Sequence, residues 1–504
     1  MSCPMEDNSP ITRKKVVDSL LWKALERVLS QGMSLVIQII LARILLPEDF
    51  GSLAIIAAVI GYANIFVQAG FGTAVVQKPD LDELDISTLF TTSMLMALLL
   101  YIVLYALAPV VSVYYDAPQL EWALRVLALI LFFNGINSIQ TGLLTRKMQF
   151  KKLFFRSMIA VPISGIIGIL LASKGFGVWA LVAQSLSNIA VVVIVMSISA
   201  DIKLRLGFSL QRAKQLYAFC VKIILSSMIA GLHDTLRTMA IGRRYSKDDL
   251  AYYDKAYTYS YYTTQIVNAT ISGVLLPVFS RKQEDTENLK RLARRSGSMS
   301  AFVMFPLLLG AASVSRLAFP LLLTEKWLPS VPYFMVFCLL RLCSCVTSID
   351  RQVFYALGKS GVNLGIEIAA FTCNLIALLS LLQIGTMAIA FGAAIVELFI
   401  SLLIFFLSSK IYGYCGKERV LDVGRPFLNA AVMAATVYAL PYIVSLAALP
   451  MLAVQIIAGI VLYLGLALLS RDSNLPLICG MVADHFIRII EKTQKQDSSS
   501  NDTY

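Results

Sequence analysis

Charged and polar side chains recur at helical spacing inside stretches of the sequence that are otherwise apolar. Between residues 216 and 241, four of them share one face of a helix: Lys222, Ser226, His233 and Arg237. Asp234 lies beside this face. An ionisable group inside a membrane costs about 3 kcal/mol even on insertion scales, so each one needs a partner, water or a function. Such a face can bind a polar or charged ligand away from bulk solvent.

Two other apolar stretches carry the same kind of face. Residues 25–46 contain Arg27 with Glu26 next to it, and residues 332–356 contain Arg341 and Arg351, with Asp350 adjacent. We therefore predict a cationic cavity that binds an anionic group through five side chains: Arg27, Lys222, Arg237, Arg341 and Arg351. Five carboxylates are predicted as charge partners or ion-coupling groups: Glu26, Asp234, Asp350, Glu367 and Glu397.

The depth of these residues leaves alternatives open. Arg27, Lys222, Arg351 and Glu367 lie within two or three turns of a helix end, from which a long side chain can extend to the interface. Arg341 and Glu397 lie near mid-span, where they either line the cavity or pair with each other. The polar groups of residues 120–142, namely Asn134, Asn137, Ser138 and Thr141, either face cargo or join helices by hydrogen bonds. Arginine favours phosphate or pyrophosphate as the anionic group, because its planar fork binds two oxygens at once.

The composition indicates an all-α integral membrane protein. Of 504 residues, 58% are hydrophobic and 15% are charged, whereas soluble chains carry about 25% charged residues. About 20 apolar residues cross a bilayer, and fourteen stretches meet that length. The fourteen are 25–46, 51–76, 88–112, 120–142, 156–173, 177–199, 216–241, 257–279, 297–323, 332–356, 362–383, 387–409, 425–445 and 448–469. The stretch 297–323 contains Pro306, Pro320 and Arg316, so a kinked or broken helix is expected there.

Basic residues in short loops predict the orientation. With Met1 in the cytoplasm, the inward loops are rich in Lys and Arg, and they include Arg156, Arg419 and the linker Leu275–Arg295. The outward loops are poorer, apart from one connection from Arg243 to Lys255. Both termini are then cytoplasmic. The net charge of +12 is assigned to orientation and to contact with anionic phospholipid headgroups rather than to nucleic acid.

A weak internal repeat divides the chain. Pro47–Gly51 matches Lys247–Ala251 at an offset of 200 residues, and two later matches follow at nearly the same offset. This predicts two pseudo-symmetric six-helix halves, 1–205 and 206–416, two added helices in 417–470, and a cytoplasmic tail, 471–504. Parallel repeats commonly enclose a cavity that opens to alternate sides, which favours a transporter.

Catalysis and cofactors are not expected. With two histidines and no Cys-x-x-Cys spacing, the sequence predicts neither a metal site nor another cofactor. It contains no Walker motif, so ATP hydrolysis is not expected. An integral-membrane glycosyltransferase or polymerase would need catalytic residues in a long outward loop, and Arg243–Lys255 is the longest charged one.

Several motifs together resemble one transporter family. They include ARILLPEDFG (42–51), GFGTAVVQK (70–78), TRKMQFKKLFF (145–155), GFGVWALV (175–182), LLPVFSRKQEDTENL (275–289) and ALGKSG (356–361). From about Trp22 to Arg471 the chain resembles the oligosaccharide flippases of the polysaccharide transporter family, which includes lipopolysaccharide and exopolysaccharide biosynthesis proteins. That family belongs to the multidrug/oligosaccharidyl-lipid/polysaccharide flippase superfamily.

The resemblance implies a multi-pass protein of the bacterial cytoplasmic membrane. Its expected activity is the transfer of undecaprenyl-pyrophosphate-linked oligosaccharide from the inner to the outer leaflet, for capsule, exopolysaccharide or O-antigen-type polymer. A polysaccharide polymerase and export machinery are the expected partners. The alternative within the superfamily is a drug/cation antiporter, which would need a net acidic cavity to bind cationic drugs.

Overall fold

The computed structural model of the chain describes residues 13–68, 71–78, 81–199, 205–280, 285–472 and 474–476. All regular structure in these residues is helical, which confirms the predicted fold class. The described residues divide into two compact units.

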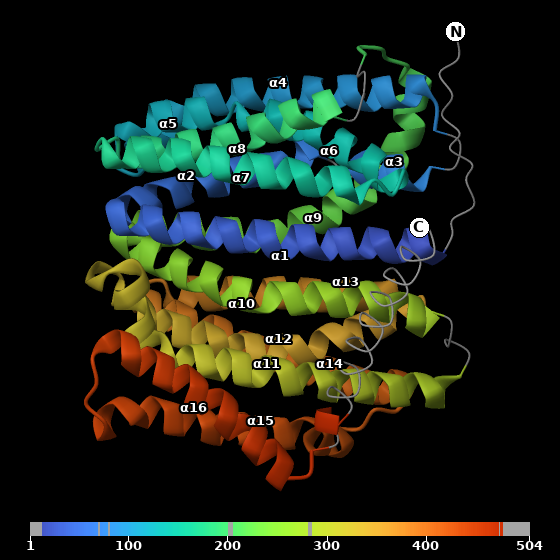
Figure 1. Ribbon diagram of the computed structural model, residues 1–504. Helices are drawn as coiled ribbons and strands as arrows, with labels where there is room; N and C mark the ends of the chain where they lie inside the picture. The colour runs from blue at the N-terminus through green and yellow to red at the C-terminus, as the bar shows by residue number, and fades with distance from the viewer. Residues whose placement is uncertain are drawn as a thin grey trace, which may run out of the picture. The chain divides into compact units, whose positions relative to one another are not determined.

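The first unit comprises the described residues of Met1–Tyr262, Leu322–Tyr333 and Leu364–Val396. Within it α7 packs between α1 and α8, and α3 packs against α6 (Figure 1). Its elements are α1 (Arg13–Ile44), α2 (Pro47–Gln68), α3 (Phe71–Gln77), α4 (Glu83–Tyr114), α5 (Gln119–Leu127), α6 (Ile130–Arg146), α7 (Phe150–Ser173), α8 (Val178–Ser199), α9 (Leu210–Arg244), the 3₁₀ turn η1 (Glu325–Trp327), most of α13 (Ser360–Leu381) and the first parts of α10 (Lys247–Ser280) and α14 (Thr386–Tyr412).

The second unit comprises the described residues of Thr263–Leu321, Phe334–Asn363 and Glu397–Tyr504. Here α15 packs against α16, and Tyr463 of α16 donates a hydrogen bond to the Phe302 carbonyl oxygen of α11 at 2.7 Å. Its helices are most of α11 (Thr286–Leu323) and α12 (Ser330–Ala356), all of α15 (Gly416–Ile443) and α16 (Ala448–Leu469), and the remaining parts of α10 and α14.

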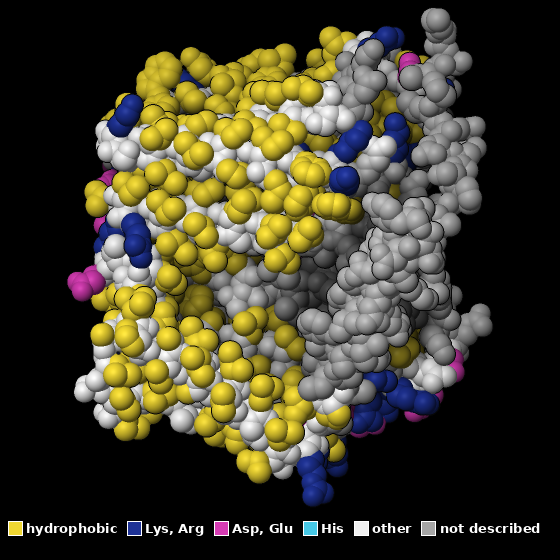
Figure 2. All heavy atoms as spheres, viewed as in Figure 1, with side chains coloured by type: hydrophobic (Ala, Val, Ile, Leu, Met, Phe, Trp, Pro, Cys, Tyr) yellow, Lys and Arg dark blue, Asp and Glu magenta, His cyan; other side chains and the backbone are white. Residues whose placement is uncertain are grey.

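Twelve helices of the described residues are long and apolar enough to cross a membrane. Large hydrophobic side chains remain exposed along them, and Figure 2 shows these side chains over the flanks of the helices, with most charged groups towards the helix ends. Such an exposed apolar surface belongs against lipid. The protein is therefore a multi-pass membrane protein. Helices α9 and α10 coincide with the seventh and eighth predicted spans but are not among the twelve, so the count of fourteen stays a prediction.

Two segments that the sequence analysis placed in loops are helical instead. The predicted outward connection from Arg243 to Lys255 is wrong, because α9 continues to Arg244 and α10 begins at Lys247. A capping pair sets this start, since the Ser246 amide donates to Asp249 Oδ2 at 3.3 Å and the Asp249 amide donates to Ser246 Oγ at 3.0 Å. The predicted linker from Leu275 to Arg295 is also mostly helix. It is divided between the end of α10 and the start of α11, with residues 281–284 outside the described part.

Two expected boundaries also differ from the structure. The stretch 297–323 is not broken, because α11 continues through Pro306 and Pro320 to Leu323. The stretch 120–142 is divided into α5 and α6.

The two matching motifs of the repeat lie against each other within the first unit. The Leu46 amide donates to Asp49 Oδ2 at 3.1 Å, the same contact that Ser246 makes with Asp249 at the start of α10. Gly51 of α2 lies directly against the Lys247 backbone, and Lys247 Nζ lies 2.9 Å from Glu48 Oε1. The turns that begin α2 and α10 are therefore equivalent locally. The domain boundaries drawn from the repeat stay a prediction.

Residues 322–333 complete this corner of the first unit. Trp327 is fully buried, and its indole Nε1 donates to the Ala42 carbonyl oxygen at 2.9 Å. Its ring packs edge-on against Phe50 and Tyr252. Lys326 Nζ donates to the Arg43 carbonyl oxygen at 2.9 Å, so the end of α1 obtains its hydrogen-bond partners from much later in the chain.

Candidate functional site

A polar cavity of about 460 Å³ lies within the first unit, between α2, α3, α6 and α7. Six of its nine lining residues carry polar side chains, in a part of the chain that otherwise crosses a membrane. The lining residues are Gln68, Gly72, Val76, Asn137, Ser138, Thr141, Gly142, Thr145 and Arg156. The predicted polar face of the fourth span therefore borders a cavity through Asn137, Ser138 and Thr141.

Arg156 is the one cation among these lining residues. Its Nη1 donates to Asn137 Oδ1 and to Thr141 Oγ1, both at 2.9 Å. Its Nε is buried and has no hydrogen-bond partner among the described residues. A buried N–H group without a partner is costly.

Close packing of α3 against α6 forms one part of the cavity wall, at Gly72 and Gly142. A side-chain carbon on Gly142 of α6 would lie 2.8 Å from the Gly72 carbonyl oxygen of α3, and one on Gly72 would lie 3.0 Å from the Ser138 carbonyl oxygen. Neither position has room for a larger residue. The glycines therefore let α3 approach α6 closely, as small residues do at helix contacts in membranes.

Glu26 extends the site behind Arg156. Its Oε1 accepts a hydrogen bond from Ser157 Oγ at 2.8 Å, and its charge acts on Arg156. Arg27 follows it on α1 and is half-buried. The placement of Arg156 in an inward loop is thus wrong, because α7 begins at Phe150 and carries Arg156 into the packed helices. Asn137 and Thr141, one turn apart on α6, are recognisable in the sequence as a polar face, but no pattern there identifies their partner.

A second polar centre of the first unit joins α9 to α10. Arg237 is buried, and its Nη1 lies 2.9 Å from Asp234 Oδ1 on the preceding turn. Its guanidinium group stacks over the rings of Tyr257 and Tyr253, with 4.4 and 5.4 Å to the centroids. The structure therefore brings Arg237 and Asp234 together, and His233 Nδ1 lies 3.4 Å from the same carboxylate oxygen.

Lys255 was missed as a buried cation because the sequence analysis placed it in a loop. It is 7% exposed, it donates to Gln38 Oε1 at 2.7 Å, and its Nζ lies 3.8 Å from the centre of the Phe50 ring. The Ser-x-x-Asp pattern at 246–249 could have located it, because a helix that begins there includes Lys255.

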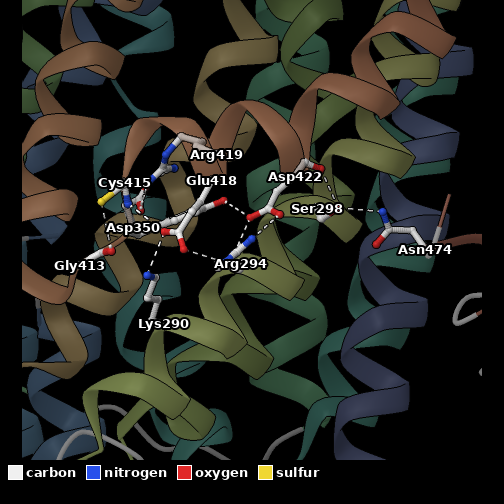
Figure 3. Close-up of polar contacts among 11 residues, drawn as sticks. Lys290, Arg294, Ser298, Asp350, Gly413, Cys415, Glu418, Arg419, Asp422 and Asn474 are labelled. Carbon is white, nitrogen blue, oxygen red and sulfur yellow. Dashed lines mark hydrogen bonds and ion pairs between the residues drawn. The ribbon is translucent and has the colours of Figure 1, made fainter.

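In the second unit, the arginine that binds Asp350 is Arg419 and not the adjacent Arg351. Arg419 donates to both carboxylate oxygens of Asp350 at 2.8 and 3.0 Å and to Ser408 Oγ at 2.8 Å (Figure 3). Tyr412 also donates to Asp350. The two side chains of the ion pair are 5% and 2% exposed, so this is a buried pair joining α12 to α15. The loop position predicted for Arg419 is wrong, because α15 begins at Gly416.

The remaining candidates are distributed over both units. Arg341 of α12 and Glu397 of α14 both act electrostatically on Cys345 and so lie in one neighbourhood of the second unit. The Arg351 carbonyl oxygen accepts a hydrogen bond from Asn363 Nδ2 at 3.1 Å. Glu367 lies on α13 in the first unit. Lys222 belongs to α9, but its side chain lies outside the described residues. Within the described ranges, no group of three His, Cys, Asp or Glu side chains could hold a metal ion.

The family model described as polysaccharide biosynthesis protein matches residues 40–332, which is more than half of the chain. The chain belongs to this family. The matched range covers both polar centres of the first unit and the Trp327 corner. The family assignment agrees with the resemblance seen in the sequence.

Three relatives of this polysaccharide biosynthesis protein carry related names. The succinoglycan biosynthesis transport protein ExoT of Rhizobium meliloti is 26% identical over 63% of this chain, a match that spans 64% of that relative's own length. The lipopolysaccharide biosynthesis protein WzxC of Escherichia coli is 24% identical over 85% of this chain and 88% of its own. The teichuronic acid biosynthesis protein TuaB of Bacillus subtilis is 23% identical over 80% and 85%.

Solved structures share the fold. The lipid II flippase MurJ in an inward closed conformation superimposes with a TM-score of 0.71 at 15% identity, over 90% of this chain and 99% of MurJ. An inward-facing multidrug resistance MATE family transporter of the MOP superfamily gives 0.60 at 14% identity, over 78% and 95%. The chain therefore has the same helical fold as these two proteins.

Proposed function

We propose that the protein flips undecaprenyl-pyrophosphate-linked oligosaccharide from the inner to the outer leaflet of the bacterial cytoplasmic membrane. It acts by alternating access, as a transporter and not as an enzyme. Membership of the polysaccharide biosynthesis family and the names of the transport and flippase relatives support this cargo. The single observation that carries the proposal is the half-buried Arg156, which lines a cavity together with amide and hydroxyl groups.

The cavity has the chemistry that a charged, hydroxyl-rich cargo requires. The Arg156 guanidinium group lines this cavity and can donate to an anionic oxygen, and charge-assisted hydrogen bonds of this kind are roughly twice as strong as neutral ones. Gln68, Ser138 and Thr145 add neutral donors and acceptors for sugar hydroxyl groups. Sugar and phosphate groups can thus leave water without losing all their hydrogen bonds.

The drug/cation antiporter alternative has less support. Asp234 and Asp350, two of the carboxylates that could attract a cationic drug, are each bound by an arginine. The glycosyltransferase alternative loses its main feature, because α9 and α10 leave only Tyr245 and Ser246 between them. Contact with anionic phospholipids, cooperation with a polymerase and export machinery, and cytoplasmic termini remain part of the proposal.

The test is an accessibility assay for lipid-linked oligosaccharide at the outer face of intact spheroplasts. Arg156→Ala removes the cation, Arg156→Lys keeps its charge without the fork, and Arg205→Ala is the control for an exposed arginine outside the helices. Loss of a charged hydrogen bond costs about 1.5–3 kcal/mol, so we expect Arg156→Ala to lower export roughly 10- to 100-fold. Complete units should then accumulate inside, while insertion stays normal.

Three results would separate the alternatives. Truncated sugars on lipid would indicate a transferase. Normal export by Arg156→Ala would remove the cavity from the proposal. If in that case Arg341→Ala traps complete units, the cargo anion binds at the cations of the second unit instead.

A further inference from the structure

The second unit carries a charged cavity of about 470 Å³ at the beginning of α11 and α15. It is separate from the cavity that contains Arg156. The lining residues are Glu287, Lys290, Arg291, Arg294, Arg295, Ser298, Glu418, Asp422 and Asn474. Four cations therefore face three carboxylates, which leaves one excess positive charge.

Two of the four cations are fixed by the carboxylates of α15. Arg294 binds Asp422 with two hydrogen bonds, Nε to Oδ2 at 2.8 Å and Nη2 to Oδ1 at 2.9 Å, and its Nη1 donates to Glu418 at 2.9 Å (Figure 3). Lys290 Nζ lies 2.9 Å from the other oxygen of Glu418. Tyr414 donates to Asp422 at 3.0 Å, and burial raises the pKa of this phenol, so it stays a donor. Glu418 and Asp422 are thus neutralised by partners already in place.

The other two cations, Arg291 and Arg295, are not fixed by carboxylates of the described residues. Arg291 and Arg295 line the same cavity and are exposed, and neither makes an ion pair with any residue in the described ranges. They lie one turn apart on α11, a spacing that puts side chains about 5–6 Å from each other. Two guanidinium groups at this spacing can bind the oxygens of one phosphate group together.

The position along α11 indicates where that phosphate comes from. The apolar stretch 297–323 begins two residues after Arg295, so the cavity lies at the level where a spanning helix meets lipid headgroups. Anionic headgroups attract basic side chains there. A soluble phosphate has the same chemistry, but it is not concentrated at the level of the lipid headgroups as an anionic phospholipid is.

We propose that Arg291 and Arg295, held beside the ion-paired wall of Lys290, Arg294, Glu418 and Asp422, form a binding site for the phosphate group of an anionic phospholipid. The site is independent of the proposed cargo. Glu287, one turn before Arg291, is the carboxylate that opposes binding, because it forms no ion pair with a cation among the described residues.

The experiment measures the association of spin-labelled phosphatidylglycerol, relative to spin-labelled phosphatidylcholine, with the full-length protein in phosphatidylcholine vesicles. Each arginine near the surface contributes about 1 kcal/mol, so Arg291→Gln with Arg295→Gln should lower the relative association constant roughly 30-fold. Lys417→Gln with Arg425→Gln is the matched control, since both residues are exposed on α15 and neither lines the cavity. We expect a smaller change there, because these two cations do not line the cavity in which one phosphate group would be bound. Glu287→Gln should strengthen association.

Equal losses in the two double variants would overturn the site, because they would show diffuse attraction to positive charge. Displacement of the labelled lipid by inorganic phosphate, with no preference for phosphatidylglycerol over it, would overturn the lipid source in favour of a soluble anion. The readout is lipid association and not export, so it stands or falls separately from the flippase proposal.

Discussion

Replacing Gly51 by alanine tests the contact between the two repeated turns. A side-chain carbon at this position would overlap the Lys247 carbonyl oxygen and would lie 2.7 Å from the Lys247 carbonyl carbon and 3.1 Å from its Cα. The optimum carbon separation is about 3.5–4.0 Å, so the distance to the carbonyl carbon alone is roughly 0.8 Å too short. Backbone atoms cannot rotate away as a side chain can, and the first turn of α10 is held by the Ser246 and Asp249 cap. We expect Gly51→Ala to lower the free energy of unfolding by about 3 kcal/mol, the upper part of the range for overpacking.

The same helix provides the control. Gly61 of α2 has no atom within 4 Å of the position that an added side-chain carbon would take, so Gly61→Ala should be neutral or stabilise by up to about 1 kcal/mol through helix propensity. Lys247→Ala removes only the ion pair with the half-exposed Glu48 and should cost less than about 1 kcal/mol. Unfolding in detergent, followed by tryptophan fluorescence, measures all three. If Gly51→Ala is as stable as Gly61→Ala, α2 and α10 do not approach each other as described.

Three further predictions concern buried polar groups. Asp350→Asn should destabilise the protein by about 3–5 kcal/mol, because it leaves the Arg419 charge buried without its partner. The double variant Asp350→Leu with Arg419→Met should recover most of that loss. If the two substitutions instead lower the free energy of unfolding in detergent additively, this reasoning is wrong. Lys255→Met should keep or raise the unfolding temperature, since it removes a desolvated ammonium group, and a clear fall in that temperature would show that the charge is stabilising. Burial raises the pKa of Tyr115 to about 12, so this phenol contributes stability below pH 10 that is lost between pH 10 and 12. Tyr115→Phe should therefore flatten the dependence of the unfolding free energy on pH over that range. If the dependence is unchanged, the raised pKa does not belong to Tyr115.

The helical membrane fold could be predicted well because lipid imposes one strong requirement. Every backbone group of a spanning segment must be satisfied internally, so long apolar stretches must be helices. Loops were predicted less well. Charge alone places Arg156, Lys255 and Arg419 outside the spans, and all three lie on helices. The capping pairs at Ser246 and Asp249 and at Asp82 and Asp85 are local signals that would have moved a boundary.

The candidate site was predicted only as faces of single helices. Asn137 and Thr141 were recognised on α6, but Arg156 comes from α7, and no single-helix pattern reports which neighbour a face meets. Adjacent charges were also a poor guide to pairing. Asp350 was associated with Arg351, yet consecutive residues on a helix point about 100° apart, and the partner is Arg419, 69 residues later.

The Trp327 corner constrains how the chain is made. The carbonyl groups at the end of α1 emerge from the ribosome early, but two of their hydrogen-bond donors, Lys326 and Trp327, are among residues 322–333. At about 5–20 residues per second, the interval between Ala42 and Trp327 lasts roughly 15–60 s. During that time the last carbonyl groups of α1 lack these two hydrogen-bond donors, and the translocon or a chaperone can contact them. The completion of α1 during biogenesis thus depends on this late segment reaching its early partners.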